Sequence, residues 1–126
     1  MIRTLTVVLA AATLANAAEP AKSMEVREIK KLAVEAKSAP EHSRVAEQWE
    51  ARAIAFEAQA AKYEQEADAR ARDKGYNPMR HKWPAMAQGP IDYLRSKAMQ
   101  ARRAADESRQ MMAHHRDLAI GLNAGN

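Results

Sequence analysis

The sequence predicts an all-α protein: a long antiparallel helical hairpin, coiled-coil-like, preceded by a short N-terminal helix. Residues 41–72 and residues 90–119 each carry a stripe of apolar or small residues at alternating steps of three and four. When the second stretch is folded back on the first, large side chains on one stripe face small ones on the other. Such spacing keeps a stripe on one helix face, and sustained over several turns it is typical of a two-stranded seam.

The two stripes fix a register in which the numbers of facing residues add to 161. The first stripe is Ala46, Trp49, Ala53, Phe56, Ala60, Tyr63, Ala67 and Arg70, and the second is Ile91, Leu94, Ala98, Ala101, Ala105, Ser108, Met112, His115 and Ala119. Phe56 then faces Ala105, Tyr63 faces Ala98, and Trp49 faces Met112. Alternating large and small residues fill such layers without voids, so this register predicts a close-packed seam.

Charged residues on the flanks of the seam favour the same orientation. The register predicts that Glu50, Glu57 and Glu64 face Arg109, Arg102 and Arg95 on one flank. On the other flank it places Glu66 beside Lys97 and Val45 beside Leu118. Exposed ion pairs contribute only a few tenths to about 1 kcal/mol each, so they select the register while apolar burial supplies stability.

Residues 1–18 read as a secretory signal peptide. Arg3 is the only charge, an apolar run extends from Leu5 to Leu14, and Ala15-Asn16-Ala17 follows. A basic start, a short apolar centre and an A-x-A ending are typical of such signals, and the run is shorter than the roughly 20 residues that span a bilayer. We therefore expect cleavage near Ala17 or Ala18, a periplasmic or secreted product, and no transmembrane segment.

The charge and cysteine content of the mature chain exclude some classes of partner and of metal site. Removal of Arg3 leaves 19 basic against 16 acidic side chains, a net charge of +3, and acids are interleaved with bases. Nucleic-acid binders gather basic residues into a stripe, so nucleic acid is not an expected partner. The chain contains no cysteine, which excludes disulfides and thiolate metal sites.

The remaining segments complete the predicted architecture. Residues 19–38 form the short helix, and Ser38 followed by Glu41 fits a capping box for the next helix. Glycines and prolines in residues 73–89 predict a loop, Gly89-Pro90 the start of the second long helix, and residues 123–126 a frayed tail after Gly121.

A second apolar stripe on the first long helix needs a cover. It consists of Ala51, Ile54, Ala58 and Ala61. Either the short N-terminal helix or a second copy of the chain could lie on it, and the second copy would make a homodimer with a four-helix bundle. The sequence does not choose between these.

Two short motifs resemble a family of short secreted bacterial all-helical proteins that is itself uncharacterised. The first is Ala36–Ala46, which contains Ala-Lys-Ser-Ala-Pro-Glu-His, and the second is His115-Arg116-Asp117-Leu118-Ala119. The resemblance covers most of the mature chain and implies an all-helical hairpin without implying an activity. This chain departs from the family at Tyr63, where many relatives carry histidine, and at Pro90-Ile91, where they carry His-Cys.

The candidate metal site is at the open end of the hairpin. The register places His42 opposite Ala119, one layer from His115, with Met112 just inside. Imidazole with thioether suits copper, and imidazole alone suits zinc. The plainer interpretation is that these are polar seam residues at a solvated helix end. A second set in the loop is Met79, His81 and Met86, while His114 falls on the outer, solvated face.

Catalysis is not expected. No Gly-rich phosphate loop, HExxH motif, or nucleophile with a placed base is visible. The sequence therefore favours a secreted, non-catalytic structural or protein-interaction module, with an envelope protein as its partner. The alternative is a periplasmic copper- or zinc-binding protein that uses His42 and His115.

Overall fold

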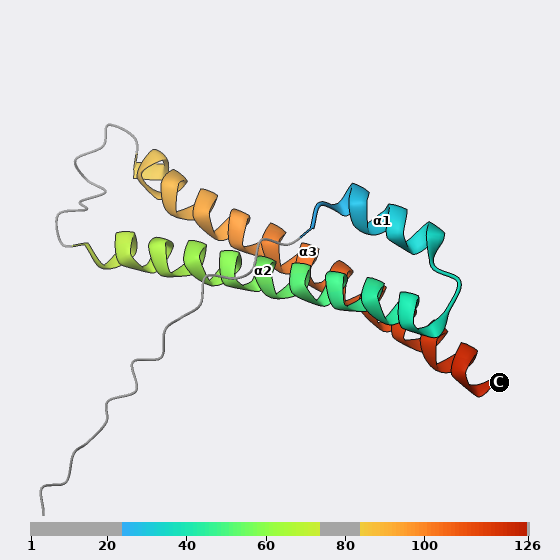
Figure 1. The fold of residues 1–126 in the computed structure, drawn as a ribbon. Helices are drawn as coiled ribbons and strands as arrows, with labels where there is room; N and C mark the ends of the chain where they lie inside the picture. The colour runs from blue at the N-terminus through green and yellow to red at the C-terminus, as the bar shows by residue number, and fades with distance from the viewer. Residues whose placement is uncertain (1–23, 74–83, 126) are drawn as a thin grey trace, which may run out of the picture.

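The computed structural model describes residues 24–73 and 84–125, and these form three helices (Figure 1). Helix α1 is Val26–Glu35, α2 is Ala39–Arg72 and α3 is Pro84–Ala124. The two long helices pack antiparallel as a hairpin, and α1 folds back along the half of α2 nearest the open end (Figure 1). The predicted all-α hairpin with a short N-terminal helix is confirmed.

The seam of the hairpin follows the predicted stripes. Its buried residues are Ala46, Trp49, Ala53, Ala60 and Ala67 on α2, and Ile91, Leu94, Ala98, Ala101, Ala105, Ser108, His115 and Ala119 on α3. Phe56, Tyr63 and Met112 are half-buried. Arg70 departs from the prediction because it is exposed and pairs with Glu66 on its own helix instead of facing Ile91. A charged side chain keeps its head in water unless a partner compensates for burial.

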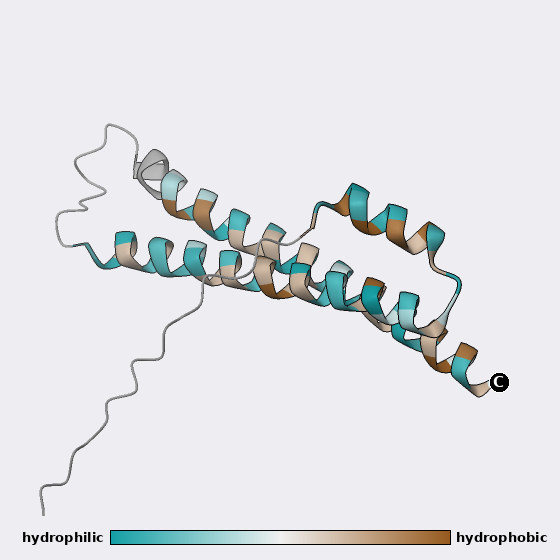
Figure 2. Ribbon diagram, viewed as in Figure 1, coloured by the Kyte–Doolittle hydropathy of each residue, from teal (hydrophilic) through white to brown (hydrophobic). Residues whose placement is uncertain are grey.

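Larger apolar side chains gather at the two ends of the seam. Ile29, Val45 and Trp49 form one buried cluster at the open end, and Ala67, Ile91 and Leu94 form the other near the loop end. The buried layers between them are mostly alanine, and Figure 2 shows the middle of the long helices as a mixture of teal and pale brown with little dark brown. Burial stabilises by about 0.8 kcal/mol per methylene, so the two clusters contribute most of the apolar stabilisation.

The capping box at the start of α2 is confirmed. The Glu41 carboxylate accepts hydrogen bonds from the backbone N–H of Lys37 at 2.7 Å and of Ser38 at 2.9 Å. These bonds lower the pKa of Glu41 because they stabilise its ionised form. The preceding helix is shorter than the predicted 19–38: α1 starts at Val26, and its C-cap Ala36 is already extended. Residues 1–23, with the predicted signal peptide, lie outside the described part.

Helix α3 is longer at both ends than the predicted 90–119. It begins at Pro84, includes Gly89 and Pro90, and continues past Gly121 to Ala124, so part of the predicted loop 73–89 and of the predicted tail is helical. Gly89 explains the passage through Pro90, since it has no Cβ to clash with the proline ring in a helical backbone. Gly121 has open space where a Cβ would be; a glycine there weakens a helix without ending it.

One flank of the seam carries three ion pairs between the long helices, and we call it the ion-paired flank. Glu50 pairs with Arg116, Glu57 with Arg109, and Glu64 with Arg102. The predicted partners were each seven residues earlier on α3, so that pairing was wrong by one heptad. Helical side chains tilt toward the N-terminus of their own helix. In an antiparallel pair, the tilt brings each glutamate toward the arginine one heptad further along α3.

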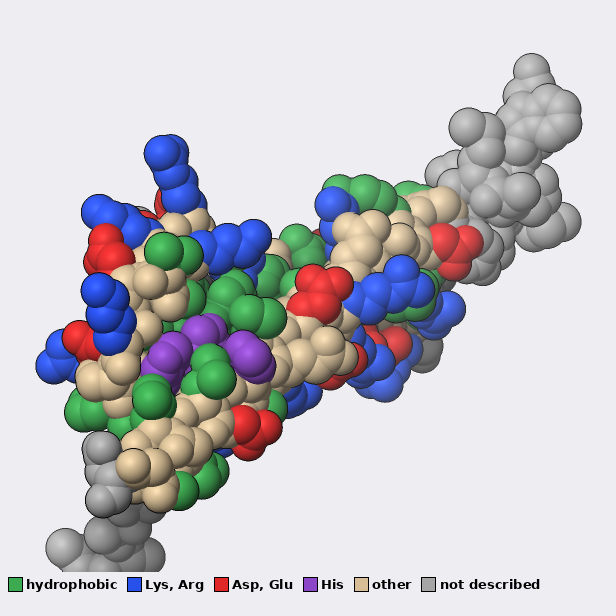
Figure 3. Space-filling view, turned by 90° about the vertical axis from the view of Figure 1, so that its right-hand side faces the viewer, with side chains coloured by type: hydrophobic (Ala, Val, Ile, Leu, Met, Phe, Trp, Pro, Cys, Tyr) green, Lys and Arg blue, Asp and Glu red, His purple; other side chains and the backbone are tan. Residues whose placement is uncertain are grey.

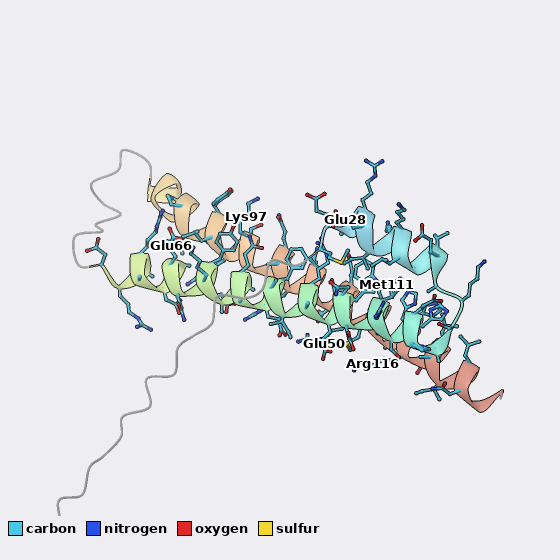
Figure 4. All side chains as sticks on the ribbon, in the orientation of Figure 1. Glu28, Glu50, Glu66, Lys97, Met111 and Arg116 are labelled. Atoms are coloured by element: carbon cyan, nitrogen blue, oxygen red, sulfur yellow. The ribbon has the colours of Figure 1, made fainter. Side chains whose placement is uncertain are left out.

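The opposite flank, which we call the α1 flank, carries Val45, Arg52, Phe56, Ala104 and Met111. Ile29 of α1 is fully buried against Val45 and Trp49 there. Figure 4 shows Met111 and Lys97 on the side of α1, and Glu50 and Arg116 on the other side. Lys97 lies over the ring of Tyr93, whereas the ion pair of Glu66 is with Arg70. Within the described residues no ion pair joins Glu66 to Lys97, and their position side by side stays a prediction.

Helix α1 leaves the second apolar stripe of α2 open. Ile54 is 55% exposed, and Ala58 and Ala61 are exposed as well. Within the described residues, the short helix therefore covers the Val45 side of α2 and not the Ile54 side. No helix in this part of the chain has an apolar stretch long enough to span a bilayer.

Candidate functional site

Two histidines meet across the seam at the open end of the hairpin. His42 lies in the first turns of α2, and His115 lies in the last third of α3. Their Nδ1 atoms are 3.1 Å apart, and their rings stack with centroids 5.3 Å apart at an interplanar angle of 23°. One imidazole must donate and the other accept in this contact, so at least one ring is neutral. The two helices bring His42 and His115 together, as the sequence register predicted.

The histidine pair is buried in surroundings of low polarity. His42 is 9% exposed and His115 is 5% exposed, and the neighbouring turns of the seam present Ala39, Ala46 and Ala119. Burial lowers the pKa of His115, because desolvation penalises the imidazolium, and the nearby charges of His114 and His42 act in the same direction. His115 is therefore favoured in its neutral form, which can accept a proton, donate a hydrogen bond or bind a metal ion.

A third histidine touches the pair from outside. His114 is exposed, as the sequence predicted, but its ring meets that of His115 edge-on, with centroids 5.3 Å apart. Figure 3 shows the histidines of the described chain gathered on one face and bordered by hydrophobic side chains. The adjacent positions 114 and 115 point about 100° apart on a helix, which is why the sequence alone did not place His114 at the site.

The methionine predicted for this site is engaged elsewhere. Met112 is half-buried and packs against the cluster of Ile29, Val45 and Trp49. This is the predicted Trp49–Met112 layer. Met79 and His81 of the second candidate set lie outside the described residues, as does the side chain of Met86.

The two imidazoles have a spacing that suits a metal ion, but they form an incomplete ligand set. Two nitrogens bound to one tetrahedral ion at about 2.0 Å lie about 3.3 Å apart, close to the separation of the two Nδ1 atoms. Within residues 24–73 and 84–125, no group of three or more histidine, cysteine, aspartate or glutamate side chains is arranged to hold a metal. The described protein thus offers two imidazoles, and further ligands would have to be water or a partner's groups.

Hollows on the α1 flank were not predicted from the sequence. One hollow of about 380 Å³ lies beside the N-terminal half of α1 and is lined by Lys30, Trp49, Arg52 and Phe56, among others. A second, of about 190 Å³, continues from Phe56 to Tyr63 and Lys97. The signal in the sequence was a row of aromatic and basic residues beside the alanine stripe.

Trp49 has one unsatisfied group in the larger hollow's wall. Its indole Nε1 is buried, and no acceptor for it is present among the described residues. A buried donor without a partner costs about 1–3 kcal/mol. The indole therefore contributes apolar area to the open-end cluster at the expense of one hydrogen bond.

Comparison of the chain with protein-family models, with curated proteins and with solved structures gives no match.

Proposed function

We propose that the chain is a secreted or periplasmic, non-catalytic interaction module that presents long helical faces to another protein of the cell envelope. The observation that supports it is the amount of apolar side chain left exposed on the hairpin. Ile54, Tyr93, Met99 and Ile120 are each more than half exposed. Of these, Ile54 shares one stripe of α2 with the exposed Ala58 and Ala61, and contiguous apolar surface on a small protein is typical of an interface.

The Ile54 stripe is the first surface to test. A photo-crosslinking amino acid at Ala58, introduced in the bacterium that secretes the protein, should give a protein adduct. Ile54→Glu should abolish that adduct, because a charge in the centre of an apolar interface is costly to desolvate. The same crosslinker at Gln48, on another side of α2, is the matched control.

The mass of the mature protein in solution, together with the mass of the crosslinked adduct, identifies which partner is bound. A dimeric mature protein that becomes monomeric with Ile54→Glu would assign the stripe to a second copy of the chain. A monomeric protein with an Ile54-dependent adduct of another mass would assign it to a different protein. If neither Ala58 nor any other helical face gives an adduct, the interaction module is rejected.

A second candidate function is metal binding, and the 3.1 Å separation of the two Nδ1 atoms favours it. In this proposal a copper or zinc ion replaces the hydrogen bond between His42 and His115, with water or a further ligand completing its coordination. The hydrogen bond would have to be broken first, so binding should release or redistribute one proton.

Calorimetric titration of copper and of zinc into the mature protein tests this candidate. Tight binding that is lost in His42→Ala/His115→Ala and retained in His114→Ala would support it. Binding in the millimolar range that is the same in both variants would remove it. Met112→Leu distinguishes a thioether ligand, since only a ligand role would make this volume-conserving change weaken copper binding.

A further inference from the structure

We infer that the part of the α1 flank beyond the N-terminal end of α1 is a docking groove. Its occupant is one helix with acidic edges, supplied by a partner protein. This inference rests on the proposed interaction function and names the chemistry of the partner. It concerns a different surface from the Ile54 stripe, so the two can fail separately.

The groove consists of two adjoining hollows along the hairpin. Phe56 lines both of them, with the larger hollow beside Val26 and Lys30 of α1 and the smaller one beside Tyr63 and Lys97. Its floor is made of small side chains, namely Ala101, Ala104 and Ser108. Hollows aligned between two antiparallel helices, with small residues at their base, suit the ridge of a third helix.

Helix α1 already occupies the same flank and shows how a helix is seated there. Its Ile29 is fully buried against Val45 and Trp49. At 1.5 Å per residue, the ten residues of α1 cover about 15 Å, whereas the 34 residues of α2 extend for about 51 Å. The open groove is therefore the continuation of an established helix–helix interface.

The spacing of the half-buried aromatics also matches a helix. Phe56 and Tyr63 are seven residues apart on α2, which is about 10.5 Å along the axis. Apolar residues at i and i+7 of a docked helix have the same separation. Each of the two would meet one aromatic ring.

Charge specifies the edges of that helix. The two hollows are lined by three cations, Lys30, Arg52 and Lys97, and by one acid, Glu107. Within the described residues, none of these three cations is in an ion pair; Arg52 lies over the ring of Phe56, with its guanidinium carbon 4.7 Å from the centroid. On the ion-paired flank, in contrast, three arginines are neutralised by glutamates. Complementary charge at the rim steers association and selects the partner.

The first test uses a defined probe and the full mature protein. The probe is a fluorescein-labelled synthetic helix of about 18 residues, roughly 27 Å long, with leucine on one stripe and glutamate on both neighbouring rows. Its matched control carries lysine in place of glutamate. Fluorescence anisotropy at about 0.15 M salt should show the acidic helix binding at least tenfold more tightly.

Charge reversal in the groove should invert that preference. Arg52→Glu/Lys97→Glu is expected to bind the lysine helix more tightly than the glutamate helix. Arg72→Glu/Arg103→Glu changes net charge by the same amount at exposed positions outside the hollows, and should keep the original preference. Circular dichroism confirms that both variants are folded. Equal binding of the two probes, or an equal loss in both variants, would overturn the inference.

Crosslinking locates the bound probe. A photo-crosslinker at Gln110, which lines the larger hollow, should label the acidic helix, while one at the exposed Gln65 should not. A Gln110 adduct between two copies of the chain would instead make the groove a self-association surface and would reject the partner helix. Loss of probe binding with retention of the Ala58 adduct would reject the groove and leave the interaction module standing.

Discussion

The contact between His42 and His115 gives the most direct test of how the open end is held together. Their Nδ1 atoms are 3.1 Å apart and both side chains are buried. Replacing one histidine by leucine leaves the other with a buried nitrogen that has lost its partner, which costs about 1–3 kcal/mol. Replacing both by leucine removes the two polar groups together and keeps a similar volume, so the double variant should lose less than the sum of the single losses.

We expect a coupling energy of about 1–2 kcal/mol between the two positions, within the range for residues in direct contact. Urea unfolding followed by circular dichroism at about pH 7.5, with a chelator present, measures the free energy of unfolding of the four proteins. In thermal unfolding, 1 kcal/mol corresponds to a shift in Tm of about 4–8 °C for a domain of this size.

A control cycle makes this outcome interpretable. His115→Leu combined with Leu94→Ala joins two sites in different layers of the seam, and their effects should add to within about 0.5 kcal/mol. If the His42→Leu and His115→Leu effects are equally additive, the hydrogen bond contributes nothing to the fold. The explanation of the open end by a paired, desolvated imidazole contact would then be refuted.

Three further predictions concern pH, helix interiors and the ion-paired flank. The pKa of His115 is held below its ordinary value of 6.5, so its contribution to stability is present above about pH 6.5 and is lost as the pH falls from there toward the folded-state pKa; Tm measured across this range should decline less in His115→Gln. Gly121→Ala should raise the free energy of unfolding by about 0.5–1 kcal/mol. Gly89→Ala should give no such gain, because the new Cβ would meet the ring of the next residue, a proline. Equal gains for the two variants in urea titration would contradict this prediction. Glu57→Arg should lower the free energy of unfolding by about 0.2–1 kcal/mol. The swap Glu57→Arg/Arg109→Glu should restore it at low salt, and a swap that restores nothing would refute the prediction.

The seam was predictable from the sequence because size complementarity leaves little freedom. Alanines such as Ala60 and Ala101 bring the helices close only if they face one another or face a larger residue, and one register satisfies this along the whole stripe. The meeting of His42 and His115 followed from the same register. Their hydrogen bond did not, because it depends on side-chain torsions and on which nitrogen carries the proton.

The flanks were harder to predict, since facing positions describe the helix axes and not the side chains. Glu50 faces a point between Arg109 and Arg116, and only the tilt of both side chains along their helices selects Arg116. The position of α1 did not follow from the sequence either, because Val45 was assigned to Leu118 and only the Ile54 stripe was offered to the short helix. The structure places α1 on Val45, where its Ile29 meets Trp49 as well.

The regular spacing of the seam has a consequence for the length of the protein. Facing residues repeat every seven positions on both α2 and α3, and so do the three glutamate–arginine pairs. Excising one heptad from each arm would leave every remaining residue opposite the same kind of neighbour, while removing seven residues from one arm alone would mismatch the lengths. Evolutionary shortening or extension of the hairpin is therefore expected to remove or add whole heptads in both long helices at once.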